Sequence, residues 1–313
     1  MMMSLAVPHE YDMNMSVQAW VYPDISPAPE CFTRGELRRV VTVGTDTVPV
    51  TVLQDSPGRP LIVRTGPTTV RMTDLKEKMR WVLGLDHDTR PCINRLIHDG
   101  TVGRLAPLLS RIRPYSSDTV YEGLMKSVIQ QQVSYRAACI LTSRFVTLLG
   151  SQTKHDGRTV FAFPTPQMVS AAGVDKLRSI GLGYKAQYLH GISSMVCRGD
   201  LEPESLRNMT YGEVREVLLP IRGVGEWTVQ TLAIASLKMF DVFPYSDLGI
   251  RNLLGRLYKG GTRMSAVEVE RWADSMGEHG PMALYLLMCA DVLGLVAGAS
   301  RKRIKELSTD LAS

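Results

Sequence analysis

Two short segments hold residues whose types and spacing could do chemistry. In the first, Gly223 and Gly225 lie two residues apart, where one predicted helix ends and the next begins. Glycine permits the positive φ that a tight turn can require, and it leaves the amide N–H groups unobstructed. Those amides lie at a helix N-terminus, where the helix dipole favours an anion, so the turn is a candidate phosphate clamp. A plain turn between two helices would have the same pattern.

The second segment places an aspartate shortly after a proline. Asp247 falls in the first turn of a predicted helix, and Pro244 and Ser246 interrupt the chain just before it. A carboxylate in that position commonly does no more than complement the helix dipole. The chemical alternative is that it stabilises the positive charge that develops on a sugar when a glycosidic bond breaks, and that it orients or deprotonates the attacking water.

The glycine turn resembles the helix-hairpin-helix of base-excision DNA glycosylases, whose usual form is L-P-G-x-G followed by one residue and then Trp or Lys. Residues 218–228 of this chain have the sequence LLPIRGVGEWT, in which Arg222 stands where proline is frequent and adds a cation beside the expected phosphate. Asp247 follows Trp227 by 247 − 227 = 20 residues. The superfamily places an aspartate at about that interval in a similar F-P-x-x-D setting, which implies that Asp247 is the catalytic carboxylate.

Position 227 predicts the type of reaction. Glycosylases of this superfamily that also nick the strand carry a lysine there, because they need an amine to form a Schiff base with C1′. Trp227 has no amine, so the resemblance implies a monofunctional enzyme that leaves an abasic site. The indole could stack on a flipped, electron-poor base, anchor the core, or do both.

Three further segments are similar to one branch of the superfamily, the 3-methyladenine DNA glycosylase II (AlkA-type) enzymes. They match in order and spacing, and together with the sheet predicted below they extend the resemblance over most of residues 30–295. They are the Q-x-x-S helix and loop at 127–134, the F-P-T-P turn and helix at 163–172, and the lead-in to the hairpin at 177–189.

The branch implies which residues contact DNA. Gln132 would fill the gap left by the flipped nucleotide, and Gln131 would lie beside it in the minor groove, although either glutamine could be a solvated loop residue. In the family, main-chain carbonyls of the hairpin also hold a monovalent cation, Na⁺ or K⁺. The other predicted DNA contacts are Ser134, Arg222, Gly223, Gly225 and Thr228, and the predicted cation-binding carbonyls are those of Leu219, Ile221 and Val224.

The expected base pocket departs from the family pattern. The family often has an aromatic residue where Met282 follows Pro281, and sometimes a tyrosine where this chain has Thr231. Tyrosines elsewhere could take over the stacking, although tyrosines near helix ends are more often packing residues. The predicted pocket residues are Trp227, Tyr245, Thr231, Met282 and Tyr285, with Tyr135 as a further candidate.

The elements that must position these residues follow from the periodicity. Short β-branched runs at 38–43, 48–53 and 61–64, separated by turn residues, predict an antiparallel sheet. Helical periods follow from residue 73 onward, and the only turn-rich stretch among them is 150–166. The predicted helices span 73–83, 89–99, 101–110, 117–132, 134–149, 166–171, 173–179, 184–197, 210–217, 224–236, 246–257, 265–275 and 280–295.

The expected fold is mainly α, with a small N-terminal α+β domain of antiparallel strands at 1–72. A helical bundle at 118–237 should end in the hairpin. A second bundle, from 73–117 together with 238–313, should carry the catalytic aspartate. The cleft between the bundles would then have Trp227 on one wall and Asp247 on the other.

Composition agrees with a globular DNA-binding protein but is weak evidence for one. The formal net charge is +5, which is compatible with a polyanionic partner. The five cysteines lie far apart, so we expect neither a disulfide framework nor an iron–sulfur cluster, and no cofactor beyond the hairpin cation. No apolar run is long enough for a membrane span, and the first residues do not look like a signal peptide. We expect a monomer that acts on double-stranded DNA in the cytoplasm with the nucleoid, or in the nucleus of a eukaryote.

The sequence therefore predicts a monofunctional glycosylase that removes alkylated purines, such as 3-methyladenine and 7-methylguanine, from duplex DNA. Two alternatives remain open: a relative that acts on oxidised, deaminated or mismatched bases, and a helix-hairpin-helix DNA-binding protein that has lost catalysis. Asp247 argues against the second, since a pure binder has no use for a carboxylate near phosphates. A purely structural helical scaffold would explain neither the glycine turn nor the aspartate spacing.

Overall fold

The N-terminal part of the chain forms a five-stranded antiparallel sheet in the computed structural model, which describes residues 1–25 and 29–296. The strand order is β1-β5-β4-β3-β2. The three predicted strands are confirmed, with ends that agree within two residues, while the two edge strands were not predicted. The strands are β1 (Met2–Leu5), β2 (Glu30–Thr33), β3 (Glu36–Val43), β4 (Asp46–Leu53) and β5 (Leu61–Thr65).

Two helices, α1 (Met13–Gln18) and α2 (Met72–Leu83), share a core with this sheet. Leu75 and Met79 of α2 are fully buried in the same cluster as Val41 and Val50 of the sheet. The apolar stripe of α2 therefore packs against the sheet. The prediction that residues from 73 onward join the second helical bundle is wrong for α2, because one apolar stripe cannot show which surface it will cover.

The first group of helices packs around α5 and carries the glycine turn. Its core holds apolar side chains from all six helices, as the sequence periods predicted. The predicted break near residue 172 is confirmed as a kink in α7, where Gly173 has a φ of 76°. The helices are α5 (Val120–Gln130), α6 (Tyr135–Leu149), α7 (Pro166–Leu177), α8 (Lys185–Arg198), α9 (Tyr211–Leu218) and α10 (Glu226–Leu232).

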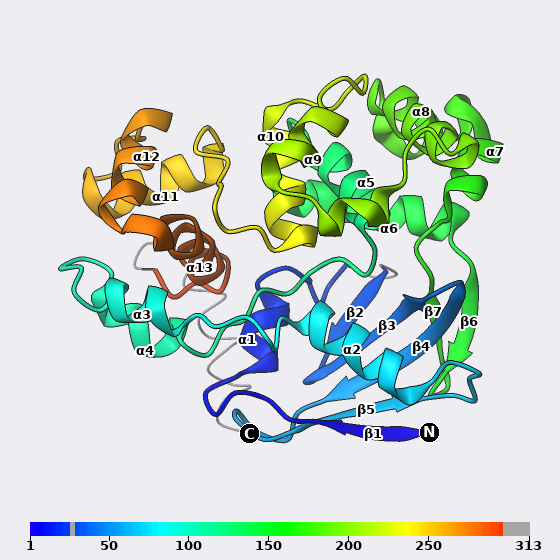
Figure 1. The fold of residues 1–313 in the computed structure, drawn as a ribbon, viewed down its shortest axis with the longest axis horizontal. Helices are drawn as coiled ribbons and strands as arrows, with labels where there is room; N and C mark the ends of the chain where they lie inside the picture. Colours follow the sequence, from blue (N-terminus) through cyan, green and yellow to red (C-terminus); the bar gives the residue numbers. More distant parts are fainter. Residues whose placement is uncertain (26–28, 297–313) are drawn as a thin grey trace.

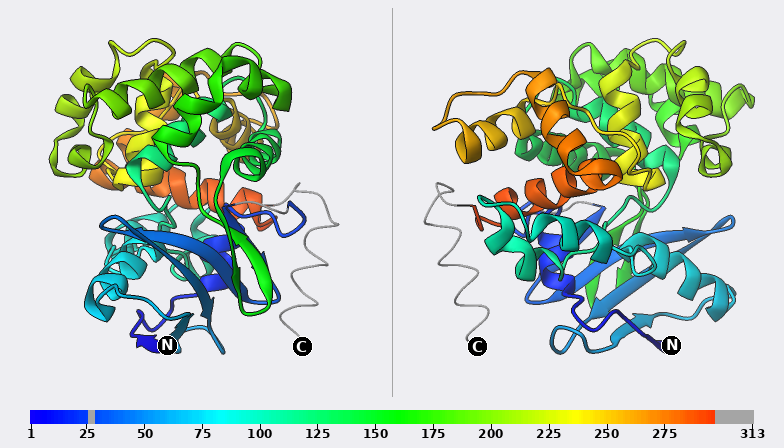
Figure 2. Two further views of the ribbon diagram at one scale, coloured as in Figure 1. Left: turned by 90° about the vertical axis from the view of Figure 1, so that its right-hand side faces the viewer. Right: turned by 60° about the vertical axis from the view of Figure 1, so that its left-hand side comes forward.

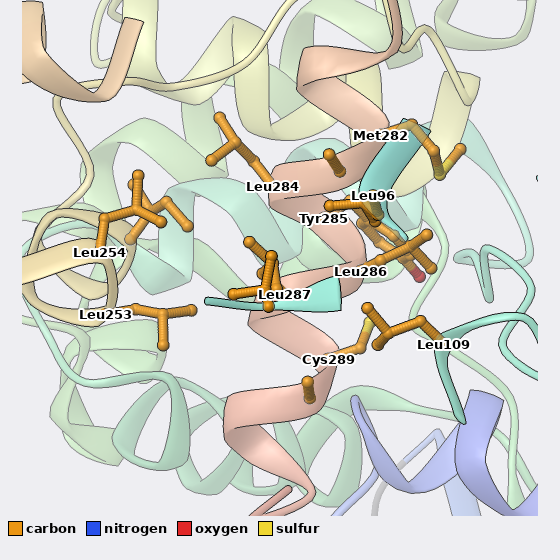
Figure 3. Close-up of a cluster of buried hydrophobic side chains, with 14 of the residues drawn as sticks. Leu96, Leu109, Leu253, Leu254, Met282, Leu284, Tyr285, Leu286, Leu287 and Cys289 are labelled. Carbon is orange, nitrogen blue, oxygen red and sulfur yellow. The ribbon is translucent and has the colours of Figure 1, made fainter. Parts of the chain in front are cut away.

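The second group of helices packs around α13 (Gly280–Val292) and lies beside the first group, and the sheet lies below the first group (Figure 1). All residues of α13 from Gly280 to Leu287 are buried, which is typical of a helix surrounded by protein (Figure 3). Residues 297–313 of the predicted bundle lie outside the described residues. The other helices are α3 (Arg90–Leu96), α4 (Ala106–Leu109), α11 (Leu248–Tyr258) and α12 (Ala266–Ser275).

A hairpin of β6 (Gln152–His155) and β7 (Arg158–Phe161) extends from the helical body to the sheet (Figure 2). At its tip, the Thr51 hydroxyl of β4 donates a hydrogen bond to Asp156 Oδ2 (2.9 Å). The sequence predicted only a turn-rich stretch here, because the two strands are short and polar. Among the described residues, no helix is both long and apolar enough to cross a bilayer.

Candidate active site

The glycine turn joins α9 to α10, and its two glycines have different roles. Gly223 has a φ of 91°, and a Cβ built there would lie 2.2 Å from Cγ of Tyr188. Gly225 is the N-cap of α10 with an ordinary φ of −110°, and a Cβ there would meet no heavy atom within 4 Å. The fold therefore requires glycine at 223, whereas at 225 it leaves open space beside the N-terminus of α10.

Gln131 fixes the position of this turn from the end of α5. Its Nε2 donates to the Gly223 carbonyl oxygen (2.7 Å) and to the Thr228 hydroxyl (2.9 Å). Thr228 is only 2% exposed. The Thr228 side chain packs beneath the turn, where its hydroxyl accepts from Gln131, and a contact of Thr228 with DNA stays a prediction. The Gln131 amide nitrogen holds the hairpin in place, and a contact of Gln131 with the minor groove stays a prediction.

Gln132 and Ser134 lie on the exposed loop between α5 and α6. Gln132 has a positive φ of 56°, and its Oε1 accepts a hydrogen bond from the Tyr184 hydroxyl (3.0 Å). Ser134 caps α6 by accepting from the Ala137 N–H (3.2 Å). Both side chains are exposed, as residues that enter a DNA groove must be.

Asp247 is the N-cap of α11, one position before the helix in which it was predicted. Its Oδ1 accepts from the main-chain N–H groups of Gly249 (2.7 Å) and Ile250 (3.3 Å). Its Oδ2 accepts from Trp227 Nε1 across 3.0 Å. Three donors therefore orient the carboxylate at the N-terminus of α11. The structure brings together the two residues that the sequence had placed on opposite walls.

The predicted pocket residues separate into two sets. Thr231 and Tyr285 line a cavity of about 160 Å³, but Met282 and Tyr245 do not. Met282 is 5% exposed and packs in the core around α13, and Tyr245 packs against that core beside Phe243. Met282 and Tyr245 therefore do not line this cavity, and their place in a base pocket stays a prediction. Trp227 does not line the cavity, and its indole N–H donates to Asp247.

The cavity lies between α5, α6, α13 and residues 20–25 and 29–30 of the N-terminal domain. Most of its aromatic lining residues were not predicted from the sequence. Trp20 stacks on Tyr285 with ring centroids 5.3 Å apart, and its Nε1 donates to the Tyr285 hydroxyl (2.8 Å). Tyr135, considered from sequence, meets Trp20 edge-on at 5.6 Å. The other aromatic residues of the lining are Tyr22, Tyr115 and Phe243.

Two lining residues belong to the segments that carry Trp227 and Asp247, although Asp247 itself does not line the cavity. Thr231 lies one helical turn after Trp227, and Pro244 lies three residues before Asp247. For scale, an engineered apolar cavity of ~150 Å³ in another protein accepts benzene.

The hairpin carbonyls fit a monovalent cation in chemical type. Carbonyl oxygens are hard ligands, and each has two lone pairs. The Ile221 oxygen accepts the Val224 N–H (3.0 Å), which leaves one lone pair for an ion, and the carbonyls of Leu219 and Val224 belong to the same turn. A site at Leu219, Ile221 and Val224 stays a prediction. In the described part of the chain, no group of three or more His, Cys, Asp or Glu residues is arranged to hold a metal ion.

Comparison with known proteins identifies the class to which this fold and site belong. Residues 125–278 match the family model described as the HhH-GPD superfamily base excision DNA repair protein. The chain is 32% identical over 199 residues to DNA-3-methyladenine glycosylase 1 of Schizosaccharomyces pombe, covering 61% of this chain and 82% of that protein. The chain therefore belongs to the HhH-GPD superfamily, and the resemblance to the AlkA-type branch is confirmed.

Two other relatives extend the comparison. A putative DNA-3-methyladenine glycosylase of Bacillus subtilis is 31% identical over 195 residues, which cover 60% of this chain and 63% of that protein. The match to the DNA-3-methyladenine glycosylase of the same organism spans 55% of its length. Among solved structures, the 3-methyladenine DNA-glycosylase from Archaeoglobus fulgidus superposes with a TM-score of 0.82 at 25% identity, over 93% of this chain and 98% of that one.

The two glycines predict opposite outcomes for stability. Gly223→Ala should lower the melting temperature markedly, because the new Cβ meets the Tyr188 ring and the residue keeps a positive φ. Gly225→Ala should leave the melting temperature nearly unchanged, because its Cβ points into open space. Thermal unfolding followed by circular dichroism measures both. Equal destabilisation of the two variants would contradict this description of the turn.

Proposed function

We propose that this protein is a monofunctional DNA glycosylase that hydrolyses the N-glycosidic bond of alkylated purines, such as 3-methyladenine and 7-methylguanine, in duplex DNA. The observation that carries the proposal is the hydrogen bond from Trp227 Nε1 to Asp247 Oδ2, on segments that also contribute Thr231 and Pro244 to an aromatic-lined cavity. The names of the relatives support the substrate class.

DNA binding would begin at the hairpin. A backbone phosphate would approach Gly225, where no side chain obstructs the N-terminus of α10, and Arg222 adds an exposed cation beside it. Gln132 would enter the gap in the duplex once the damaged nucleotide has left the stack. The flipped base would then occupy the cavity and stack against rings such as Trp20 and Tyr135. An electron-poor alkylated purine gains most from that stacking.

Asp247 would act on the sugar. As the bond to the base breaks, C1′ gains positive charge, and an anion that is already oriented stabilises this charge without reorganisation. The same carboxylate can orient or deprotonate the water that attacks C1′. Trp227 would act as a positioning residue, because its N–H fixes Oδ2. An alkylated purine that already carries a positive charge needs no general acid to leave.

Asp247→Asn should reduce base release about a hundred- to a thousandfold, the usual cost of losing a charge-stabilising group. The fold should survive, because asparagine is also a good N-cap and keeps an oxygen for the Gly249 N–H. The measurement is single-turnover release of 3-methyladenine, with binding to abasic DNA as the control. Activity within about tenfold of the wild type would overturn the assignment.

Strand cleavage should appear only after alkali treatment or addition of an endonuclease, and borohydride should trap no enzyme–DNA adduct. The reason is that Trp227 stands where a lyase needs its amine. Lys238, which follows Trp227 in the sequence, is held over the Trp81 ring (4.7 Å) and donates to the Trp81 carbonyl oxygen. Denaturing electrophoresis after reduction makes the test. A stoichiometric trapped band would show that a lysine does form the Schiff base.

Gly225→Val should weaken binding to all duplexes about equally, because phosphate contacts position DNA without reading its sequence. The effect should appear in a protein with an unchanged melting temperature, since the folded chain has room for the side chain. Arg222→Ala should act more mildly and lower the slope of the salt dependence by about one. Fluorescence anisotropy with an abasic duplex across a salt series gives both values. If the DNA affinity of Gly225→Val equals that of the wild type, the hairpin is a structural turn and does not bind phosphate.

A further inference from the structure

One side of the cavity is charged, although the rest of its lining is mainly aromatic and aliphatic. Lys126 of α5 and Glu30 of β2 both line it. The Glu30 side chain is 8% exposed and that of Lys126 is 25% exposed. Neither residue belongs to the hairpin or to the aspartate segment.

Lys126 has more hydrogen-bond donors than the protein uses. Its Nζ donates to Glu30 Oε1 (2.7 Å) and to Glu122 Oε1, one helical turn earlier on α5. An ammonium group has three N–H donors and no acceptor. With two acceptors among the described residues, one donor remains for water or a ligand, and Lys126 lines the cavity.

The neighbouring charges keep this arrangement rigid and neutral. Arg39 of β3 lies 3.6 Å from Glu30 and 3.3 Å from Glu122, so two cations face two anions. Burial by itself would lower the pKa of Lys126, but Glu122 and Glu30 outweigh it, and the net pKa is raised. Burial likewise acts to raise the pKa of Glu30, but Lys126 and Arg39 hold it below its usual value.

We propose that Lys126 and Glu30 recognise the edge of the base that enters the cavity. Lys126 donates to a carbonyl oxygen or ring nitrogen of the base, and Glu30 accepts from a neighbouring N–H or amino group. The ligand class is a bicyclic heterocycle with an acceptor beside a donor, as in hypoxanthine, 7-alkylguanine and adenine derivatives. The inference rests on the proposed function, because it assumes that the cavity receives a base.

Edge recognition changes the expected selectivity. Stacking alone discriminates weakly between flat rings of similar size. A ligand that displaces water from a charged donor and offers it no acceptor leaves that donor unpaired, so an analogue that lacks the acceptor binds more weakly. This protein should therefore prefer a base with a polar edge over an apolar ring of the same shape.

The test compares two free ligands on the full chain by isothermal titration calorimetry. Hypoxanthine carries an acceptor beside a donor, whereas indole has a similar bicyclic shape and an N–H but no acceptor. The wild type should bind hypoxanthine about tenfold or more tightly than indole, as expected for a hydrogen bond to a charged group. Lys126→Met should abolish this preference and leave indole affinity unchanged within about twofold.

Two further variants separate recognition from folding. Lys78→Met removes another partly buried lysine, which pairs with Asp118 (3.2 Å) outside the cavity, and should keep the preference for hypoxanthine. The double variant Lys126→Met with Glu122→Gln removes one charge of each sign and leaves Arg39 paired with Glu30. It should also abolish the preference for hypoxanthine. The double variant gives the answer if the single variant fails to fold.

The possible results distinguish the two proposals. An unchanged preference in folded Lys126→Met protein, or no preference in the wild type, overturns edge recognition while leaving the glycosylase proposal intact. Binding of neither ligand overturns the cavity as a base site and edge recognition with it. Asp247→Asn should bind hypoxanthine as the wild type does, so loss of turnover in that variant bears only on catalysis.

Discussion

The contact between Trp227 and Asp247 joins the two helical groups at the point where chemistry would occur. Trp227 belongs to α10, whose apolar residues pack in the cluster around α5, and Asp247 begins α11, which packs around α13. A carboxylate oriented by an indole N–H and two main-chain amides keeps its position as long as both groups keep theirs. The geometry of the site therefore depends on how the two clusters pack.

The N-terminal domain takes part in the site in addition to supporting the helices. Trp20 packs on two of the hydrophobic clusters and stacks on Tyr285 of α13. Arg39 extends from β3 into the buried ion cluster with Glu122 of α5. Buried charges of this kind are expensive to separate, so the cluster fixes the sheet relative to the helices and fixes one side of the cavity. The β6–β7 hairpin makes a second connection to the sheet.

Much of the architecture could be predicted because the signals were local. The helical periodicity predicted almost every helix, and it also predicted the break at Gly173. Where the prediction erred, a distant partner decided the outcome. Asp118, expected at the start of a helix, accepts instead from the Thr42 N–H of the sheet (2.8 Å), and α5 begins after Thr119. The polar strands β6 and β7 lack the apolar alternation that predicts a strand, so the sequence could not reveal them before their contact with the sheet was known.

By itself, the sequence determined the glycine turn, the candidate aspartate and the residue that stands in the lyase position, because each depends on residue type and short-range spacing. Only the tertiary structure decided what surrounds them. It put Tyr285 against Trp20, which are 265 residues apart, and it bonded Gln131 to Gly223 and Thr228 of the turn. It also left Gly225 open while filling the space at Gly223. A side chain's partners depend on which distant surfaces meet, and hydrophobic burial, which brings those surfaces together, has no direction that the local sequence could encode.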